Sequence, residues 1–342
     1  MIDHRKALDI LAASDARRAA RRRFIKVAGG STLALSSAAL LSGCFDDDDG
    51  GTIPPPTPTP SPTPTPTVTP VTDADILNLA LNLEYLEAQF YLYAVNGTGL
   101  PAAQTASGSG AAGGTVTGGA RVDFSGDPLV GAYAREIAAD EAAHVAFLRT
   151  ALGSAAVAMP NINISGDANG AFTAAARAAG VVGASETFNP YSSPENFLLG
   201  AYIFEDVGVT AYKGAAPLLS SKVYLEAAAG ILAAEAYHAG LVRTVLYAKG
   251  MTTGALLTAA SKISDARDTL DKNGDSDQGL TATGGAANIV PADENAVAYS
   301  RSSGQVHNIV YLNASGSNVN GGGFFPNGTN NANPTLRVGL PS

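Results

Sequence analysis

Two short stretches of the sequence place a histidine three residues after a glutamate. They read Glu141-Ala-Ala-His144 and Glu235-Ala-Tyr-His238. Three residues turn an α-helix by about 300° and advance it by about 4.5 Å, so the two side chains of each stretch share one helical face. Carboxylate oxygen and imidazole nitrogen are donors that iron and manganese accept in proteins. The two stretches therefore predict a metal site if both faces turn inward.

In each half of the chain this pair is preceded by another glutamate, which has a tyrosine seven residues after it. These are Glu84 with Tyr91, and Glu205 with Tyr212. In both halves an Arg-Thr pair begins five residues after the histidine. The sequence thus repeats one pattern, which indicates a duplicated pair of helices.

The charges of this residue set also favour a metal. Four glutamates carry a charge of −4, which two divalent ions would cancel. Four ionised carboxylates in a core would otherwise cost several kcal/mol each, and their pKa values would rise until some held a proton. The chain has ten glutamates, so both helical histidines would follow a glutamate at this spacing by chance in roughly one sequence in a thousand.

Four segments with apolar residues at helical spacing can position these side chains. Asp73 is the expected N-cap of the first, and Ser192 to Glu195 has the spacing of a capping box at the start of the third. The predicted helices run from Asp73 to Gly97, from Asp127 to Gly153, from Ser192 to about Gly214 and from Pro217 to Gly250. Four helices of roughly 20–30 residues form a bundle. Residues 97–126, which are rich in Gly, Ala, Ser and Thr, are expected to form a long loop or a loose hairpin, and residues 153–191 form a second variable stretch between helices.

One glutamate from each of two helices and Glu-x-x-His from each of the other two resemble the di-iron or di-manganese carboxylate site of the ferritin-like superfamily. Within it, the chain is similar to bacterial exported ferritin-like proteins related to desiccation-related proteins. The phrases Leu83-Glu84-Tyr85-Leu86-Glu87-Ala88 and Pro291-Ala292-Asp293-Glu294-Asn295 carry this likeness. The resemblance covers about residues 73–342 and implies an all-α ferritin-like four-helix bundle with long loops and a partly irregular C-terminal extension.

The resemblance also implies the metal ligands. Two Fe or Mn ions would be bound, with Glu84 and Glu205 as terminal ligands, Glu141 and Glu235 as bridges, and His144 and His238 giving one nitrogen each.

Three further residues are expected beside these ligands. Glu87 has Gly208 as its counterpart in the repeat, so it either supports the ligands or replaces Glu84 as a ligand if the helix is shifted by one turn. Tyr91 and Tyr212 are expected to fill the core, with participation in redox chemistry as the alternative, and each could donate a hydrogen bond to a ligand carboxylate. Arg149 and Arg243 lie about 140° around their helices from the histidines and should pair with carboxylates away from the metals.

The N-terminal residues resemble targeting signals. Within residues 1–43, the run that begins at Arg21 and Arg22 and reads RRRFIK is similar to a twin-arginine export signal, and LSGC, which ends at Cys44, is similar to a bacterial lipobox. The sequence therefore predicts export by the twin-arginine machinery and a lipid anchor at Cys44. Phe45, where an aspartate would signal inner-membrane retention, favours the outer membrane over the inner membrane, with the protein on the periplasmic side.

Four parts are expected along the chain. Residues 1–43 are the signal, and 44–72 are an acidic and Pro/Thr-rich stalk of polyproline character. Residues 73–262 form the bundle, and 263–342 form a C-terminal extension that covers one end of it.

The extension has three expected features. A fifth helix runs from about Thr252 to Leu270. The segment 271–278 (DKNGDSDQ) alternates oxygen-bearing residues like the start of a calcium loop, but the later positions fail this pattern, so a turn is expected. Residues 306–312 (VHNIVYL) have strand-like composition, with His307 in a structural role.

Charge and cysteine content exclude several classes of protein. The net charge is −9, and it is −14 once residues 1–43 are left out, so no nucleic-acid partner is expected. One cysteine excludes a disulfide framework, an iron–sulfur cluster and a rubredoxin-type pair of the kind that feeds electrons to rubrerythrins.

Two functions remain open. The first is an oxidoreductase of catalase-like or peroxidase-like type, acting on a small oxidant in envelope stress defence. The second is a stress-protective or metal-binding envelope protein without turnover, as the desiccation-related resemblance implies. An exposed apolar face of the bundle would also allow a homodimer.

Overall fold

The computed structural model describes residues 70–272, 274–281, 283–314 and 319–339. The predicted export signal at Arg21 and Arg22, the predicted lipidation site Cys44 and nearly all of the predicted stalk lie outside the described residues. None of the helices within those ranges is both long enough and apolar enough to span a bilayer.

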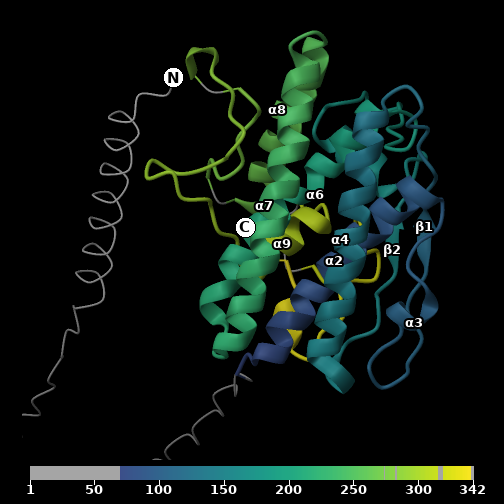
Figure 1. Cartoon of the computed structure of the whole chain (residues 1–342), viewed down its shortest axis with the longest axis vertical. Coiled ribbons are helices and arrows are strands. Elements are labelled where there is room, and N and C mark those ends of the chain that lie inside the picture. Colours follow the sequence, from purple (N-terminus) through teal and green to yellow (C-terminus); the bar gives the residue numbers. More distant parts are fainter. Residues whose placement is uncertain (1–69, 273, 282, 315–318, 340–342) are drawn as a thin grey trace, which may run out of the picture. The chain divides into compact units, whose positions relative to one another are not determined.

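Four long helices make up the core of the fold, as predicted (Figure 1). They are α2 (Asp73–Asn96), α4 (Pro128–Leu152), α6 (Pro194–Ala215) and α7 (Lys222–Gly250). Helix α2 packs mainly against α4, and α6 packs mainly against α7, while α2 and α6 contact each other. The two pairs correspond to the two halves of the sequence repeat.

Three predicted helix starts are displaced by a few residues. Thr72, and not Asp73, caps α2, because its side chain accepts from Asp75 N while the Asp75 carboxylate accepts from Thr72 N. Asp73 instead accepts backbone hydrogen bonds from Ser220 and Ser221, and so ties the start of α2 to the start of α7.

The starts of α6 and α7 are displaced in a similar way. Ser193 caps α6 through Asn196 N, so the predicted Ser192–Glu195 box is one residue out of register. Pro217 lies in the short 3₁₀ turn η2 (Ala216–Leu218), and α7 begins later, at Lys222. Both helix ends that were predicted from glycine after α2 and α4 are confirmed, since Gly97 and Gly153 adopt positive φ at the C-caps.

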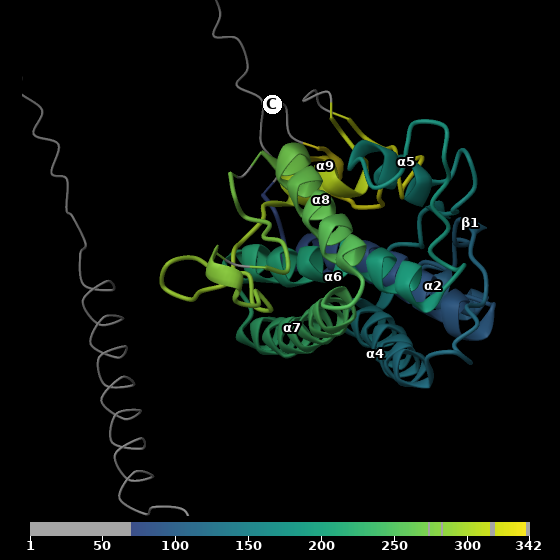
Figure 2. The same ribbon diagram turned by 90° about the horizontal axis from the view of Figure 1, so that it is seen from above.

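Helices α2 and α6 are central, whereas α4 and α7 lie on one side of them. In the view of Figure 2, α8 (Gly254–Asp271), α9 (Ser303–Val310) and α5 (Ala171–Ala178) lie on the opposite side. Burial agrees with this layering: 17 of the 24 residues of α2 are buried, but only nine of the 25 of α4. The C-terminal extension therefore covers a flank of α2 and α6, and not one end of the bundle as expected.

The two predicted loops contain a small sheet. Strand β1 (Val116–Gly118) pairs in parallel with β2 (Ile162–Ile164), with Val116 opposite Ile162. The first loop also contains the single-turn helix α3 (Ala102–Thr105), and the short 3₁₀ turn η1 (Gly153–Ala155) follows α4. The loose hairpin considered for 97–126 is thus wrong, because its strand pairs with the other loop.

The predicted strand at 306–312 is also wrong, because these residues belong to α9 and the turn after it. Ser302 and Gln305 form a capping box that starts this helix, and the local cap overrides the strand-like composition. His307 is buried with Nδ1 2.7 Å from Ser303 O and Nε2 2.9 Å from Thr329 Oγ1. Burial lowers the pKa of His307 to about 4, so it is a neutral, structural residue.

Six buried charges join the extension to the bundle. Arg243 lies 2.7 Å from Asp206 of α6, and Arg267 of α8 lies 2.8 Å from both Asp206 and Asp277. Arg301 completes the network with contacts to Asp271, at 2.6 Å, and to Asp277. Three arginines thus balance three aspartates. Two of these aspartates, Asp271 at the end of α8 and Asp277, come from the 271–278 segment, and their pairing with arginines favours the expected turn over the calcium loop.

The prediction for the repeated arginines is confirmed in one half only. Arg243 pairs with a carboxylate away from the glutamate–histidine cluster, as expected. Arg149 instead donates to Tyr85 Oη, at 2.7 Å, and to the carbonyl oxygens of Ala103 and Ala106.

Removal of Arg301 should destabilise the whole fold. In an Arg301→Met variant, Asp271 and Asp277 lose a buried counter-charge, and the free energy of unfolding should fall by about 3–5 kcal/mol. Urea denaturation followed by circular dichroism measures this loss. The matched control is Arg135→Met, at an exposed position of α4, which should change the free energy of unfolding by less than about 0.5 kcal/mol. Equal effects of the two substitutions would contradict the assigned role of the network.

Candidate metal site

The six predicted ligands come together between the four long helices. The four glutamates are at most 1% exposed, and His238 is 5% exposed. Because each Glu-x-x-His stretch lies on the inward face of its helix, both histidines point to the same region as the glutamates of α2 and α6. The two imidazole rings lie 6.3 Å apart, centre to centre.

One group of donors surrounds His144. Its Nδ1 atom lies 3.2 Å from Glu84 Oε2, 3.5 Å from Glu141 Oε2 and 3.8 Å from Glu235 Oε1. Each of these four residues offers one donor atom within 4.8 Å of the others. Ligands about 2.1 Å from a metal lie up to about 4.2 Å apart, so the spacing is close to that of a coordination sphere.

A second group surrounds His238. Its Nδ1 atom lies 3.1 Å from Glu141 Oε1 and 3.7 Å from Glu205 Oε2. Potential metal-ligand atoms again lie within 4.8 Å of one another, here from Glu205, Glu235 and His238. Glu141 and Glu235 are thus close to both groups, which suits bridging ligands, whereas Glu84 and Glu205 each belong to one group. Coordination by these six residues stays a prediction.

The buried polar atoms provide a test of whether a metal fits. Both carboxylate oxygens of Glu141 and of Glu235, together with Glu205 Oε2 and His238 Nδ1, are buried without a hydrogen bond to any described residue. Such atoms are costly to leave without partners. Since all of them are donors for hard or borderline metal ions, the residues present fit a carboxylate–histidine metal centre.

The two tyrosines of the repeat cross between the halves. Tyr91 of α2 donates to Glu205 Oε1 of α6, and Tyr212 of α6 donates to Glu84 Oε1 of α2. Each bond fixes one oxygen of a predicted terminal ligand, while the other oxygen faces a histidine: Glu84 Oε2 lies 3.2 Å from His144 Nδ1, and Glu205 Oε2 lies 3.7 Å from His238 Nδ1. Both tyrosines are buried, as expected, and the hydrogen bond to a carboxylate that the sequence allowed is observed for each.

The electrostatics show how unfavourable this cluster is by itself. Burial raises the pKa of Glu205 to about 8, and burial with the nearby Glu235 and Glu84 raises the pKa of Glu141 well above its usual range. Burial, and to a lesser extent repulsion from the charge of Glu87, raise the pKa of Glu235 well above its usual range. For Glu84, burial opposes ionisation, but the hydrogen bond and charge of His144 outweigh it, so its pKa is lowered. Protons or metal ions must therefore neutralise most of the cluster.

Glu87 is buried one turn after Glu84 but belongs to neither donor group. Burial and the charges of Glu205 and Glu84 raise its pKa well above the usual range. Its counterpart Gly208 leaves space for Glu235, because a Cβ atom there would lie 2.3 Å from Glu235 Oε2. The placement favours Glu84, and not Glu87, as the ligand from α2.

Asp140 is a residue of this site that the sequence analysis missed. Its Oδ2 atom lies 3.1 Å from His238 Nε2, on the side of the ring that faces away from Glu141. A carboxylate at this nitrogen holds the proton there and leaves Nδ1 free to bind metal. The available signal was an acid directly before Glu141, although the other half has Ala234 at this position.

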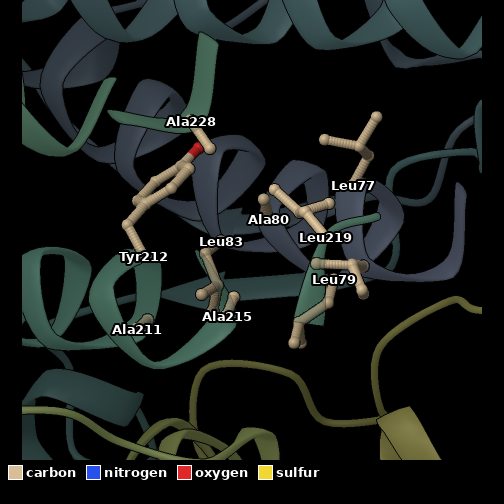
Figure 3. A pocket seen from close by; sticks show the side chains of 10 residues that line it. Leu77, Leu79, Ala80, Leu83, Ala211, Tyr212, Ala215, Leu219 and Ala228 are labelled. Atoms are coloured by element: carbon tan, nitrogen blue, oxygen red, sulfur yellow. The ribbon is translucent and has the colours of Figure 1, made fainter. Parts of the chain in front are cut away.

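Two pockets approach the site from different sides. A small apolar pocket of about 20 Å³ lies beside Tyr212, with Leu83 and Ala228 among its lining residues (Figure 3). An open groove of about 640 Å³ lies between α4 and α7 and reaches His238 and Asp140. The groove is thus the more polar route from solvent to the glutamate–histidine cluster.

The fold and the site define a helical bundle with a buried carboxylate–histidine centre. Residues 72–248 match the family model of the ferritin-like domain, and the chain belongs to this family. It is 30% identical over 274 residues to the ferritin-like catalase Nec2 of Nesocodon mauritianus, across 75% of this chain and 83% of that protein. It is also 30% identical over 247 residues to the desiccation-related protein PCC13-62 of Craterostigma plantagineum, across 68% of this chain and 75% of that protein. No solved structure matches the chain significantly.

Removal of the Asp140 carboxylate should weaken metal binding. In Asp140→Ala, His238 loses the acceptor that orients its ring, and the affinity for Mn²⁺ should fall about 10- to 100-fold. Competition with a chelator of known affinity measures this change. The matched control is Glu136→Ala, one turn earlier on the same helix, which should bind Mn²⁺ within about threefold of the unaltered protein. An unchanged affinity in Asp140→Ala would contradict the role given to this residue.

Metal affinity should also rise with pH. Because burial raises the pKa of Glu205 to about 8, this carboxyl holds a proton at pH 6 that a metal ion must displace. Each displaced proton gives about a tenfold change in affinity per pH unit, so the dissociation constant for Mn²⁺ should be at least about 100-fold larger at pH 6 than at pH 8. A Glu205→Gln variant should bind more weakly and show a shallower pH dependence. Equal affinities of the unaltered protein at the two pH values would contradict this account.

Proposed function

We propose that this protein binds two Fe or Mn ions in the buried centre and removes hydrogen peroxide. The observation that carries the proposal is the set of buried carboxylate and imidazole donors that lack hydrogen bonds. A pair of such ions, when bound, supplies a two-electron couple that can both oxidise and reduce peroxide. The similarity to a protein named ferritin-like catalase supports peroxide as the oxidant.

The side chains of this chain would provide the rest of the chemistry. Glu141 and Glu235 would hold the two ions together, while Glu84 and Glu205 would each bind one ion. Tyr212 and Tyr91 donate hydrogen bonds to those two terminal carboxylates and hold them in place. Disproportionation of two H₂O₂ molecules to two H₂O and one O₂ needs no outside reductant, which suits a chain that has no rubredoxin-type cysteine pair.

The alternative is a protective or metal-binding protein without turnover. The similarity to a desiccation-related protein favours it. In that case the metal would only stabilise the bundle, by neutralising its buried carboxylates, and the loaded protein would not consume peroxide.

A peroxide assay with matched variants separates the two. The metal-loaded protein should release O₂ from H₂O₂, and Glu141→Ala should lower the rate at least about 100-fold because it removes a bridge between the two ions. Glu226→Ala, at an exposed position of α7 outside the groove lining, is the control and should keep the rate. An oxygen electrode measures both. If the folded, fully metal-loaded protein released no O₂, the proposed enzymatic function would be contradicted and the protective function would remain.

We also propose that the protein acts on the outer side of the cytoplasmic membrane. Export would use Arg21 and Arg22, and a lipid on Cys44 would hold the chain in the outer membrane in preference to the inner one. A Pro/Thr-rich stalk between anchor and bundle would keep the bundle away from the lipid. The proposed partners are the twin-arginine machinery, the membrane itself and a second copy in a homodimer.

Replacement of Cys44 tests the anchor. In the expressing bacterium, Cys44→Ala should move most of the protein from the membrane fraction to the soluble periplasmic fraction, because no thiol is left to carry the lipid. An Arg21→Lys, Arg22→Lys double variant should remain in the cytoplasm. Immunoblots of the separated fractions show both effects. Membrane retention of the Cys44→Ala protein would contradict the anchor.

A further inference from the structure

The groove between α4 and α7 has the size and the lining of a small-molecule site. Its volume of about 640 Å³ falls within the roughly 300–1,000 Å³ that is usual for such sites. Tyr133 of α4 and Tyr237 of α7 line it, together with the aliphatic residues Leu241, Val245 and Ile289. Hydrogen peroxide has two heavy atoms, so the groove is far larger than peroxide requires.

The groove is connected to the predicted metal centre through one side chain. His238 and Asp140 both line it, and they are joined at 3.1 Å between Nε2 and Oδ2. The opposite nitrogen of His238 lies 3.1 Å from Glu141 Oε1. A molecule in the groove would therefore be one imidazole ring away from the cluster, which is a short route for electrons.

The groove lining limits the chemistry of its ligand. Among the described residues, no lysine or arginine lines the groove, while Asp140 and Glu136 do. Such a lining disfavours anions and offers carboxylate acceptors to hydroxyl donors. Tyr237 is 80% exposed, so its ring is available to stack on a flat ligand.

We propose that this groove binds a small, neutral dihydroxyaromatic reductant, and that the protein can use it to reduce peroxide. The proposal rests on the proposed peroxide reaction at the metal centre. In the balanced reaction, the hydroquinone loses two electrons and two protons and becomes the quinone. The O–O bond of one H₂O₂ breaks, and the peroxide takes up those electrons and protons to give two H₂O.

Binding is tested without turnover. Calorimetry of the full-length protein with 1,4-hydroquinone, in the absence of oxygen and peroxide, should show one site per chain. Tyr237→Ala should weaken binding at least tenfold, whereas Tyr237→Phe, which keeps the ring, should stay within about threefold. Phe147→Ala removes an exposed aromatic residue of α4 outside the groove lining and should leave binding unchanged. Cyclohexane-1,4-diol, which has the hydroxyl groups but no aromatic ring, should not compete.

The reaction is then tested with the metal-loaded protein. Hydroquinone and peroxide should yield benzoquinone, detected by its absorbance, at one quinone for each peroxide reduced, and Tyr237→Ala should lower the rate at low hydroquinone concentration. Absence of hydroquinone binding, equal binding by Tyr237→Ala, or competition by the cyclohexanediol would overturn the proposal. Oxygen release from peroxide alone tests the proposed function separately, so failure of one proposal can be told from failure of the other.

Discussion

The structure depends on one constraint: the glutamates and histidines of the cluster are packed together in the interior, between the four long helices. Burial raises the pKa values of Glu141, Glu205 and Glu235, and several of their oxygens have no hydrogen-bond donor among the described residues. Removing these groups from water would be unfavourable unless positive charge were supplied. Two divalent ions, as we propose, would supply it, and the arrangement of the four helices places the carboxylate and imidazole donor atoms within 4.8 Å of one another in each group.

The surrounding structure serves to hold this cluster rigid. Tyr91 and Tyr212 each donate a hydrogen bond to a glutamate of the other half, so these two bonds connect the two helix pairs at the site. On the flank away from α4 and α7, the extension covers α2 and α6, and a buried network of three arginines and three aspartates fastens it. The opposite side of the bundle carries the groove, which reaches the cluster where Asp140 supports His238.

The sequence predicted the elements whose signals are local. Helical periodicity, glycine caps and the Glu-x-x-His spacing are enough to predict the four helices and the cluster, because the spacing of residues along one helix decides which side chains share its inward face. It did not predict the contact between Asp140 of α4 and His238 of α7, because these two residues lie 98 positions apart in the chain. The parallel strands β1 and β2 and the network around Arg301 were missed for the same reason. The 306–312 segment was mistaken for a strand because composition was weighed above the Ser302 capping box.

Metal content of the full-length protein, purified from its natural host, is the most direct test of the central claim. Plasma mass spectrometry should find about two Fe or Mn per chain, and less than one in a Glu141→Ala, Glu235→Ala double variant that remains helical. A folded, helical protein without bound metal would contradict the account, since the buried carboxylates would then be neutralised by protons alone.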